Sequence, residues 1–437
     1  MNVINTKKDF KMKKILIIST ITAASLFATN GSNLMGLGVE SRALGGTGIA
    51  NFNGAENALS NPALLGKSKA QREFSFGGTI FDATVKVTTT AGDTTNPADA
   101  TSKTSAQDKS MIPVVALSNR INDSLVFGLG MYGTAGMGTD WRGDNVNAAV
   151  GKVALYNMRS ALMLMQFAPS LAYSNDNFGV GLSAIMQYGQ LSIDYDTAQG
   201  PTEANPGALK HVGNGPSQDY GYGFQLGAFY NLNENLTLAG VYKSAIDMEY
   251  KDQISKAALA FGYGSHAGAL AAKSDHLEQP AEVGVGLSYV MNTMTYTVDY
   301  KTIKWGEAKG YKDFGWENQN VIALGAKYSG NGYWYGLGYN SANNPIKNNK
   351  DTTSVAGGAN TNGDTMNLFN YAMFPATITK AYTFGAGFDI SKDSTLSFAY
   401  MLAPEVSDTV SGASVGVGDI TTKHSQSATT IAYKFAF

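Results

Sequence analysis

Apolar side chains alternate with polar or small ones along most of this chain, at the period of two that β-strands with two different faces show. Long loops alternate with short turns between the segments that carry this pattern. Such asymmetry, with an even number of strands, is typical of bacterial outer-membrane barrels. We therefore predict an all-β fold, a 14-stranded antiparallel transmembrane β-barrel with both chain termini in the periplasm. The predicted strands are residues 70–90, 111–119, 123–134, 161–174, 177–196, 218–231, 235–250, 278–291, 293–305, 316–329, 332–342, 376–391, 394–406 and 421–437.

Membrane-spanning helices are not predicted, because no uninterrupted apolar stretch of about 18 residues follows the N-terminal segment. A chain that crosses a bilayer without helices must close into a barrel, since lipid offers no hydrogen-bonding partner to an open sheet edge. A soluble β-sandwich or propeller is the alternative. Neither of those folds requires that alternate connections differ in length.

The final strand has one strongly aromatic face. Ile431, Tyr433, Phe435 and Phe437 share that face, which we expect to meet lipid, while Lys434 points to the lumen. Tyr433, Phe435 and the terminal Phe437 are similar to the sorting signal that outer-membrane barrels present to the barrel assembly machinery. This similarity implies a Gram-negative cell envelope.

The N-terminus has the pattern of a secretory signal peptide. Five lysines precede an apolar run over residues 15–27, and small and polar residues follow it. The run is shorter than the roughly 20 residues that a membrane-spanning helix needs. We assign residues 1–28 to the signal peptide, with cleavage between about residues 28 and 31.

Composition supports the barrel and limits the chemistry. The 437 residues include 50 glycines, 23 tyrosines and 20 phenylalanines, only 15% are charged, and there is no cysteine. The formal net charge of −2 gives no indication of a nucleic-acid partner. The four histidines lack metal-ligand spacing, so we interpret them as solvated loop residues and predict no metal and no cofactor. They are His211, His266, His276 and His424.

A glycine-rich segment precedes the first predicted strand. Gly45, Gly46 and Gly48 lie too close together for a stable helix or strand, which favours a compact coil. In the sequence Ser60-Asn61-Pro62-Ala63, the proline favours an extended Asn61, whose amide can bond backbone on both sides. We predict that residues 29–69 form a plug, or hatch, inside a barrel of residues 70–437.

Residues 45–48 and 60–63 and the spacing between them resemble the N-terminal hatch of the FadL family, outer-membrane transporters of long-chain fatty acids and other hydrophobic compounds. Segments 299–302, 323–328, 339–345 and 374–375 agree with the same resemblance. The resemblance implies facilitated diffusion of a fatty acid or hydrocarbon through a monomer embedded in outer-membrane lipid and lipopolysaccharide.

The resemblance also implies a route. The third strand would bend inward at its glycines and open a gap for lateral exit, with Asn61 lying against that strand. An apolar outer-loop groove would first capture the substrate, which then moves to a lumenal pocket above the hatch. The residues implied are Gly128, Gly130 and Gly133 for the kink, and Leu259, Phe261, Tyr263 and Leu270 for the groove.

Three lysines fall on the predicted lumen face: Lys243, Lys301 and Lys327. Any of them could pair with a carboxylate headgroup, although polar lumen residues occur in every barrel. No nucleophile with a neighbouring base stands out, so enzymatic activity is not predicted. A general diffusion porin and a structural or adhesive barrel remain the alternatives, and the sequence does not decide between fatty acid and hydrocarbon.

Overall fold

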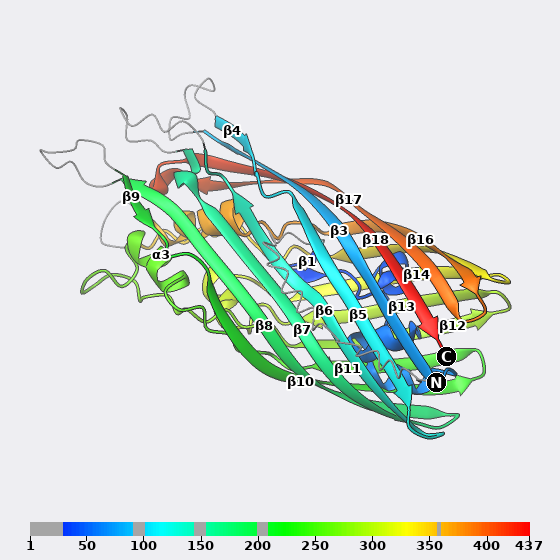
Figure 1. Ribbon diagram of the computed structural model, residues 1–437. Helices are drawn as coiled ribbons and strands as arrows, with labels where there is room; N and C mark the ends of the chain where they lie inside the picture. Colours follow the sequence, from blue (N-terminus) through cyan, green and yellow to red (C-terminus); the bar gives the residue numbers. More distant parts are fainter. Residues whose placement is uncertain (1–28, 91–100, 144–153, 199–208, 356–359) are drawn as a thin grey trace, which may run out of the picture.

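The computed structural model describes residues 29–90, 101–143, 154–198, 209–355 and 360–437. Within these residues, fourteen strands pair antiparallel with their neighbours and close into a barrel, which confirms the predicted fold (Figure 1). The barrel closes where β18 pairs with β3, from Ala436 opposite Glu73 to Ile420 opposite Thr89. The wall strands are β3 (Arg72–Thr89), β5 (Lys109–Arg120), β6 (Leu125–Asp140), β7 (Arg159–Ser174), β8 (Phe178–Ala198), β10 (Ser217–Asn233), β11 (Leu236–Lys243), β12 (Glu282–Met291), β13 (Met294–Ile303), β14 (Gln319–Ser329), β15 (Tyr333–Ala342), β16 (Lys380–Ser391), β17 (Ser394–Gly412) and β18 (Gly418–Ala436).

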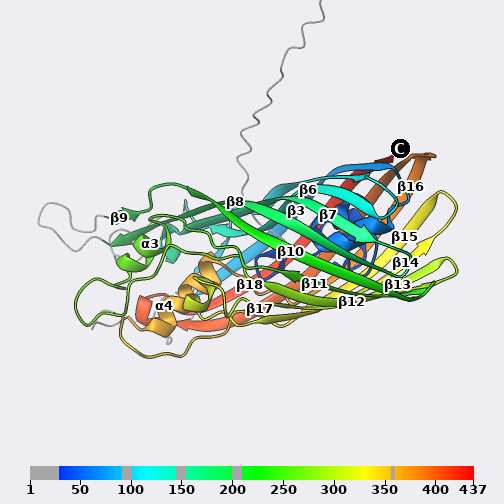
Figure 2. The same cartoon turned by 90° about the horizontal axis from the view of Figure 1, so that it is seen from below.

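Two short strands lie within connections that the sequence suggested were loops. They are β4 (Thr101–Thr104), which pairs with β3, and β9 (Leu209–Val212), which pairs with β8. Figure 2 shows the long connections at one end of the barrel and the short turns, with the C-terminus, at the other. The helical segments of the long connections are η5 (Ala154–Asn157), α3 (Ile254–Ala260), η6 (Tyr311–Phe314), α4 (Asn362–Leu368), η7 (Phe369–Met373) and η8 (Ala413–Val415). In the described parts of the chain, every helix is too short or too polar to cross a membrane.

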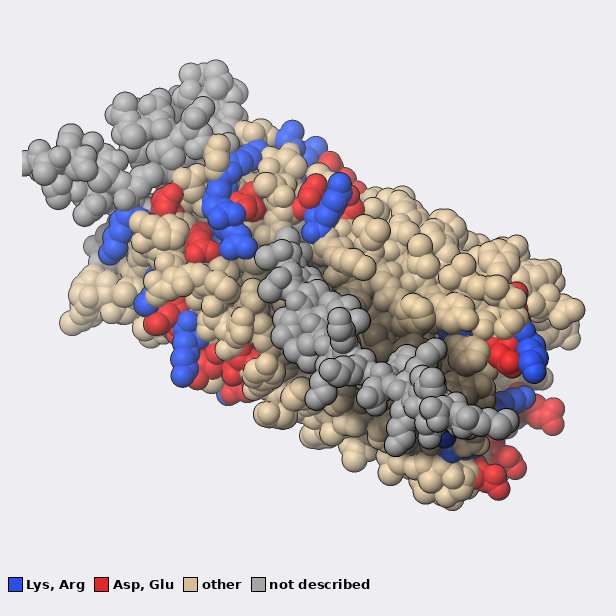
Figure 3. All heavy atoms as spheres, viewed as in Figure 1, with Lys and Arg blue, Asp and Glu red and all other residues tan. Residues whose placement is uncertain are grey.

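The wall has an apolar outer face and a polar inner face, as the alternation predicts. Large apolar side chains are exposed on the outside, for example Ile80, Leu182, Tyr222 and Leu337. Buried polar side chains such as Ser75, Thr79 and Gln187 point inward. On the face that Figure 3 shows, the visible charged side chains gather towards the two ends, and uncharged residues lie between them.

The C-terminal residue closes the seam of the barrel. The amide of Phe437 donates to the carbonyl of Arg72 at 2.9 Å, and the amide of Arg72 donates back at 2.8 Å. Aromatic rings from both strands pack outside this seam, with the Phe76 and Tyr433 centroids 5.6 Å apart.

Deleting Phe437 should therefore reduce the amount of assembled barrel while synthesis continues, because two seam hydrogen bonds and one outward ring are lost together. Heat-modifiable gel mobility and protease resistance in isolated outer membranes measure assembly. Phe437→Tyr, which keeps the ring and the backbone, is the matched control. Normal levels of protease-resistant barrel in the deletion variant would contradict this reading of the C-terminus.

The segment before β3 folds inside the barrel, where Figures 1 and 2 show it in blue. Most side chains between residues 30 and 65 are buried. Its elements are β1 (Thr29–Asn30), β2 (Asn33–Leu34), α1 (Val39–Ala43), η1 (Gly54–Glu56), α2 (Asn57–Ser60) and η2 (Pro62–Lys67). The lumen is therefore occupied by the chain's own N-terminal hatch.

Candidate functional site

The glycines of the hatch allow its backbone to touch the wall. Gly45 has a φ of +71°, and a Cβ atom there would lie 2.6 Å from the carbonyl oxygen of Tyr339 on β15. Its amide donates to Thr383 Oγ1 at 2.9 Å, and its carbonyl accepts from Asn340 Nδ2 at 2.8 Å. Gly46 also has a positive φ, of +88°. Only glycine adopts this conformation freely at such close approach.

Asp299 on β13 holds the next turn of the hatch. The amides of Gly48 and Ile49 both donate to Asp299 Oδ2, at 2.7 and 2.9 Å. Three strands along the wall, on β10, Gln225 Nε2 donates to the carbonyl of Ser60 at 2.7 Å. The hatch is thus bonded to wall strands at several points between β10 and β16.

Asn61 is fully buried and makes hydrogen bonds through both ends of its amide. Its Nδ2 donates to the carbonyl of Ile49 at 2.7 Å and to that of Ala228 at 3.4 Å, and its Oδ1 accepts from the amide of Ala63 at 3.1 Å. Ala228 belongs to β10, the sixth wall strand, so the prediction that Asn61 lies against the third strand is wrong.

Residues 61–63 pack directly against two wall glycines. Neither glycine was among the predicted site residues. Gly181 on β8 and Gly227 on β10 are paired in register. A Cβ atom on Gly181 would lie 2.4 Å from the amide nitrogen of Ala63, and one on Gly227 would lie 2.0 Å from Asn61 Oδ1. Glycine inside a strand pattern marks such close approach, and this signal was available in the sequence.

Partly buried ion pairs also hold the hatch against the wall. Glu40 lies 2.9 Å from Lys327 Nζ on β14 and 3.1 Å from Lys434 Nζ on β18. Burial by itself raises the pKa of Glu40, but the two ammonium groups outweigh burial and lower that pKa from 4.5 to about 2. Lys327 therefore forms an ion pair with the hatch.

The pairing between β5 and β6 is incomplete. It covers residues 114–120 of β5 and 126–132 of β6, and ends after Val114 opposite Tyr132. Pro113 follows on β5 and has no amide to donate. The ladder between β6 and β7 shifts register between Gly133 and Ala135, as in a β-bulge.

The outer half of β6 is buried on both faces. Exposed and buried residues alternate as far as Met131, but every residue from 132 to 139 is buried. The ladder between β5 and β6 is therefore interrupted after Tyr132, while an inward bend that opens the wall stays a prediction. Gly128 and Gly130 lie in the paired part below this interruption, where Cβ atoms would meet Leu65 at 2.5 Å and the Tyr132 ring at 2.3 Å; a Cβ on Gly133 would meet Ile112 at 2.6 Å.

The N-terminal hairpin β1–β2 lies against this free edge of β6. Asn33 pairs with Ala135, and the amide of Gly136 donates to the carbonyl of Ser32 at 3.0 Å. A Cβ atom on Gly31 would lie 2.6 Å from the Trp305 ring. The hairpin thus packs between the edge of β6 and the ring of Trp305.

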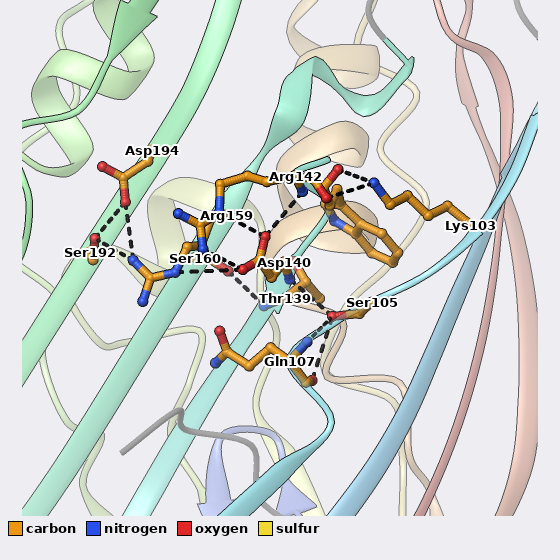
Figure 4. A network of polar contacts seen from close by, with 11 residues as sticks. Lys103, Ser105, Gln107, Thr139, Asp140, Arg142, Arg159, Ser160, Ser192 and Asp194 are labelled. Atoms are coloured by element: carbon orange, nitrogen blue, oxygen red, sulfur yellow. Dashed lines mark hydrogen bonds and ion pairs between the residues drawn. The ribbon is translucent and has the colours of Figure 1, made fainter. Parts of the chain in front are cut away.

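We call the stretch of β6 that lacks pairing with β5, residues 133–139, the gap. A polar network bounds this gap on the side of the long loops (Figure 4). The amide of Ala106 donates to the carbonyl of Asp140 at 2.9 Å, and the Asp140 amide donates to Ser105 Oγ at 2.9 Å. Arg142 and Arg159 lie on either side of the Asp140 carboxylate, at 2.6 and 4.0 Å. The gap therefore spans about half of β6 and is bounded at both ends.

A cavity of about 90 Å³ separates the hatch from the wall. We call it the hatch–wall cavity. Its lining includes Asn33 of the hairpin and Thr134 of the β6 bulge, and on the opposite wall Lys243, Lys301 and Asp299. The cavity thus extends from β11–β13 to the hairpin and the bulge at the gap.

The three predicted lumen lysines have different surroundings. Lys301 Nζ lies 3.1 Å from Glu282 Oε2, so it is ion-paired. Lys243 Nζ donates to Gln166 Oε1 at 2.8 Å, and no carboxylate of the described residues lies within 4.0 Å of it. Lys327 is bound to Glu40 and does not line the cavity.

Apolar packing closes the lumen above the cavity. The rings of Trp305, Tyr311 and Trp316 have centroids 4.5–5.2 Å apart. Helices α4 and η7 fold inward beside them, and the carbonyl of Ala372 accepts from Trp141 Nε1 at 2.6 Å. This segment falls between two predicted strands and was expected to be a loop, although most of its residues 366–374 are apolar.

The four predicted groove residues are not brought together on the surface. Leu259 is 50% exposed, whereas Phe261 and Tyr263 are buried and Leu270 is partly buried. The Phe261 ring packs on those of Tyr195 and Phe369, with centroids 5.3 and 5.2 Å away. Phe261 and Tyr263 are thus part of the lumen closure, and their placement in an open groove is wrong.

The histidine prediction is wrong for His424, which is buried in β18 and contacts Gln426. His211 is exposed and contacts Asp196, His276 is partly exposed and contacts Asp247, and His266 is exposed in a loop. Among the residues that the structure describes, there is no group of three or more acidic or histidine side chains placed to hold a metal ion.

A closed antiparallel barrel with an apolar outer face, filled by its own N-terminal domain, defines a plugged outer-membrane channel. Residues 15–437 match the family described as outer membrane protein transport protein (OMPP1/FadL/TodX), and the chain belongs to this family. The resemblance seen in the hatch is confirmed. The family consists of transport proteins and is not an enzyme family.

Solved structures share the fold at low identity. A Pseudomonas aeruginosa FadL homologue matches with a TM-score of 0.67 and 15% identity, over 93% of this chain and 100% of that one. The P. putida toluene transporter TodX matches with 0.65 and 17%, over 92% and 99%. The Ralstonia pickettii toluene transporter TbuX matches with 0.60 and 17%, over the same shares.

One curated relative matches only in part. An uncharacterized protein of the phosphoenolpyruvate carboxykinase gene 5′ region of Chlorobium limicola is 44% identical over 64 residues. The match covers 14% of this chain and 32% of that relative.

Proposed function

We propose that this protein takes up hydrophobic compounds across the outer membrane by facilitated diffusion, with exit through the wall between β5 and β6. The observation that carries the proposal is that residues of the hairpin and of the β6 bulge both line the hatch–wall cavity. Displacement of residues 29–34 would therefore connect the cavity to the gap. An apolar chain that leaves through the wall into lipid does not have to enter water. That transfer costs about 0.8 kcal/mol per methylene.

The family and two of the similar structures, described as toluene transporters, support hydrophobic substrates. In our proposal, Leu259 and the loop around it make the first contact with substrate, which then passes the aromatic closure. The chain works as a monomer in outer-membrane lipid and lipopolysaccharide, after insertion by the barrel assembly machinery, with both termini in the periplasm. Residues 1–28, outside the described part, serve as the signal peptide.

Uptake and conductance together test this function. The protein should raise the uptake of labelled oleate or toluene by cells that lack related channels, while the purified protein conducts ions poorly in planar bilayers because the hatch fills the lumen. High conductance without uptake would indicate a general porin. Neither activity would indicate a structural or adhesive barrel.

Replacing the lumen lysines by methionine should separate their roles. Lys243→Met should reduce uptake of a carboxylate, because this ammonium has no ion-pair partner in the described residues and is free to bind the headgroup. The binding free energy lost with the charged hydrogen bond is about 1–3 kcal/mol. Lys327→Met is the matched control, since Lys327 binds Glu40, and it should not alter the preference for oleate over toluene. An unchanged preference in Lys243→Met would place the headgroup elsewhere or favour uncharged substrates.

A further inference from the structure

Four buried side-chain oxygens around the hatch–wall cavity have no hydrogen-bonding partner among the described residues. Their side chains all line the cavity. Buried polar atoms in native proteins nearly always have a partner, whether protein, water or ligand. The four are Gln225 Oε1, Gln279 Oε1, Asp299 Oδ1 and Thr134 Oγ1.

The hatch fixes the orientation of two of these acceptors. Gln225 donates its Nε2 to the carbonyl of Ser60 at 2.7 Å, which leaves Oε1 free to accept. Asp299 uses Oδ2 to accept from the amides of Gly48 and Ile49, and its Oδ1 stays unpaired. Both side chains are therefore preorganised and cannot turn away without losing contacts to the hatch.

A chain of hydrogen bonds fixes the third acceptor. The Glu282 carboxylate can only accept, so the Asn33 atom 3.0 Å from it must be the amide nitrogen. Asn33 Oδ1 then accepts from Gln279 Nε2 at 2.6 Å. Gln279 Oε1 is consequently the free atom, and it is an acceptor.

Of the two lysines that line this cavity, only Lys243 lacks a carboxylate partner among the described residues. An ammonium group has three donors, and Lys243 Nζ uses one of them, on Gln166 Oε1 at 2.8 Å. Lys301, by contrast, is neutralised by Glu282 at 3.1 Å. A ligand head in the cavity thus lies near one ammonium group without a carboxylate partner and near lining side chains whose oxygens have no donor among the described residues.

We infer that the hatch–wall cavity binds the polar head of an amphiphile that carries both a carboxylate and a hydroxyl group, a hydroxy acid with an apolar tail. This inference rests on the proposed uptake of hydrophobic compounds. A hydrocarbon pairs with none of these groups, and an ionised carboxylate only accepts hydrogen bonds. A hydroxyl donates to an acceptor such as Gln279 Oε1 while the carboxylate accepts from Lys243, so such a head can pair with both kinds of group.

Equilibrium binding to the purified full-length protein in nanodiscs tests this with four probes: 3-hydroxydecanoate, decanoate, 1-decanol and decane. We expect 3-hydroxydecanoate to bind about tenfold more tightly than decanoate, the factor that corresponds to 1.4 kcal/mol. In Gln225→Leu or Gln279→Leu this ratio should fall towards one while decanoate still binds. In Lys243→Met the affinity for both acids should fall relative to the affinity for 1-decanol.

Equal affinity of the wild-type protein for the two acids would overturn the inference, and so would a ratio that neither glutamine variant changes. Uptake of decanoate or decane without any hydroxyl preference would overturn the inference and leave the proposed function standing. If the protein neither binds nor takes up any of the four probes, the proposed function fails together with the inference. Because the glutamines lie on different segments, misfolding of one variant leaves the other as a test.

Discussion

Uptake should stop when the N-terminal hairpin is cross-linked to β6 and should return on reduction. Asn33 and Ala135 are direct partners in an antiparallel bridge, where Cα atoms lie about 4.5–5.5 Å apart, within the range that a disulfide spans. The chain has no cysteine of its own, so Asn33→Cys with Ala135→Cys forms a unique pair. We expect an almost complete and reversible loss of oleate uptake, because the bond holds the hairpin in the gap.

Two controls make this result specific. Each single cysteine variant should keep its uptake under oxidation. A disulfide between Ser341→Cys and Lys380→Cys, paired across β15 and β16 away from the gap, should also have no effect. Undiminished uptake through the oxidised Asn33–Ala135 pair would exclude lateral exit at β6 and favour passage past a displaced hatch.

Gly181→Ala should release the hatch and raise ion conductance. The new Cβ atom would lie 2.4 Å from the amide nitrogen of Ala63 and 2.5 Å from the Pro62 carbonyl carbon. Both are backbone atoms, so no side-chain rotation relieves the clash, and residues 61–63 must leave β8 and β10. Asn61→Ala should act in the same direction, at about 1–3 kcal/mol for buried groups left unpaired.

Gly240→Ala is the matched control, because a Cβ atom there meets its nearest neighbour, the Gly284 carbonyl, at 3.7 Å. Planar-bilayer recordings should show larger and noisier currents for Gly181→Ala and wild-type currents for Gly240→Ala. Outer-membrane abundance should stay constant for both, since the wall ladders do not depend on the hatch. Wild-type conductance in Gly181→Ala would mean that residues 61–63 do not anchor the plug.

The wall was predictable because strand alternation is a local property. Near the C-terminal end of β18, polarity indicates the face of each side chain, and Tyr433, Phe435 and Lys434 were assigned to the correct sides. The polarity of His424 suggested a loop, yet it lies on the inner face of the same strand, where Gln426 is its neighbour. Local polarity therefore identifies the strand better than it identifies the partner of each side chain.

What the sequence by itself determined is the order of the strands, the hatch ahead of them and the glycines that permit close contact. Only the tertiary structure decided which wall strand each hatch residue touches, because closing the barrel brings β8 and β10 to Asn61 from more than 100 residues away. It also decided that Lys327 is bound to Glu40 while Lys243 faces the cavity. Three lysines with the same alternation differ only in partners from distant segments, and a pattern of period two contains no information about those partners.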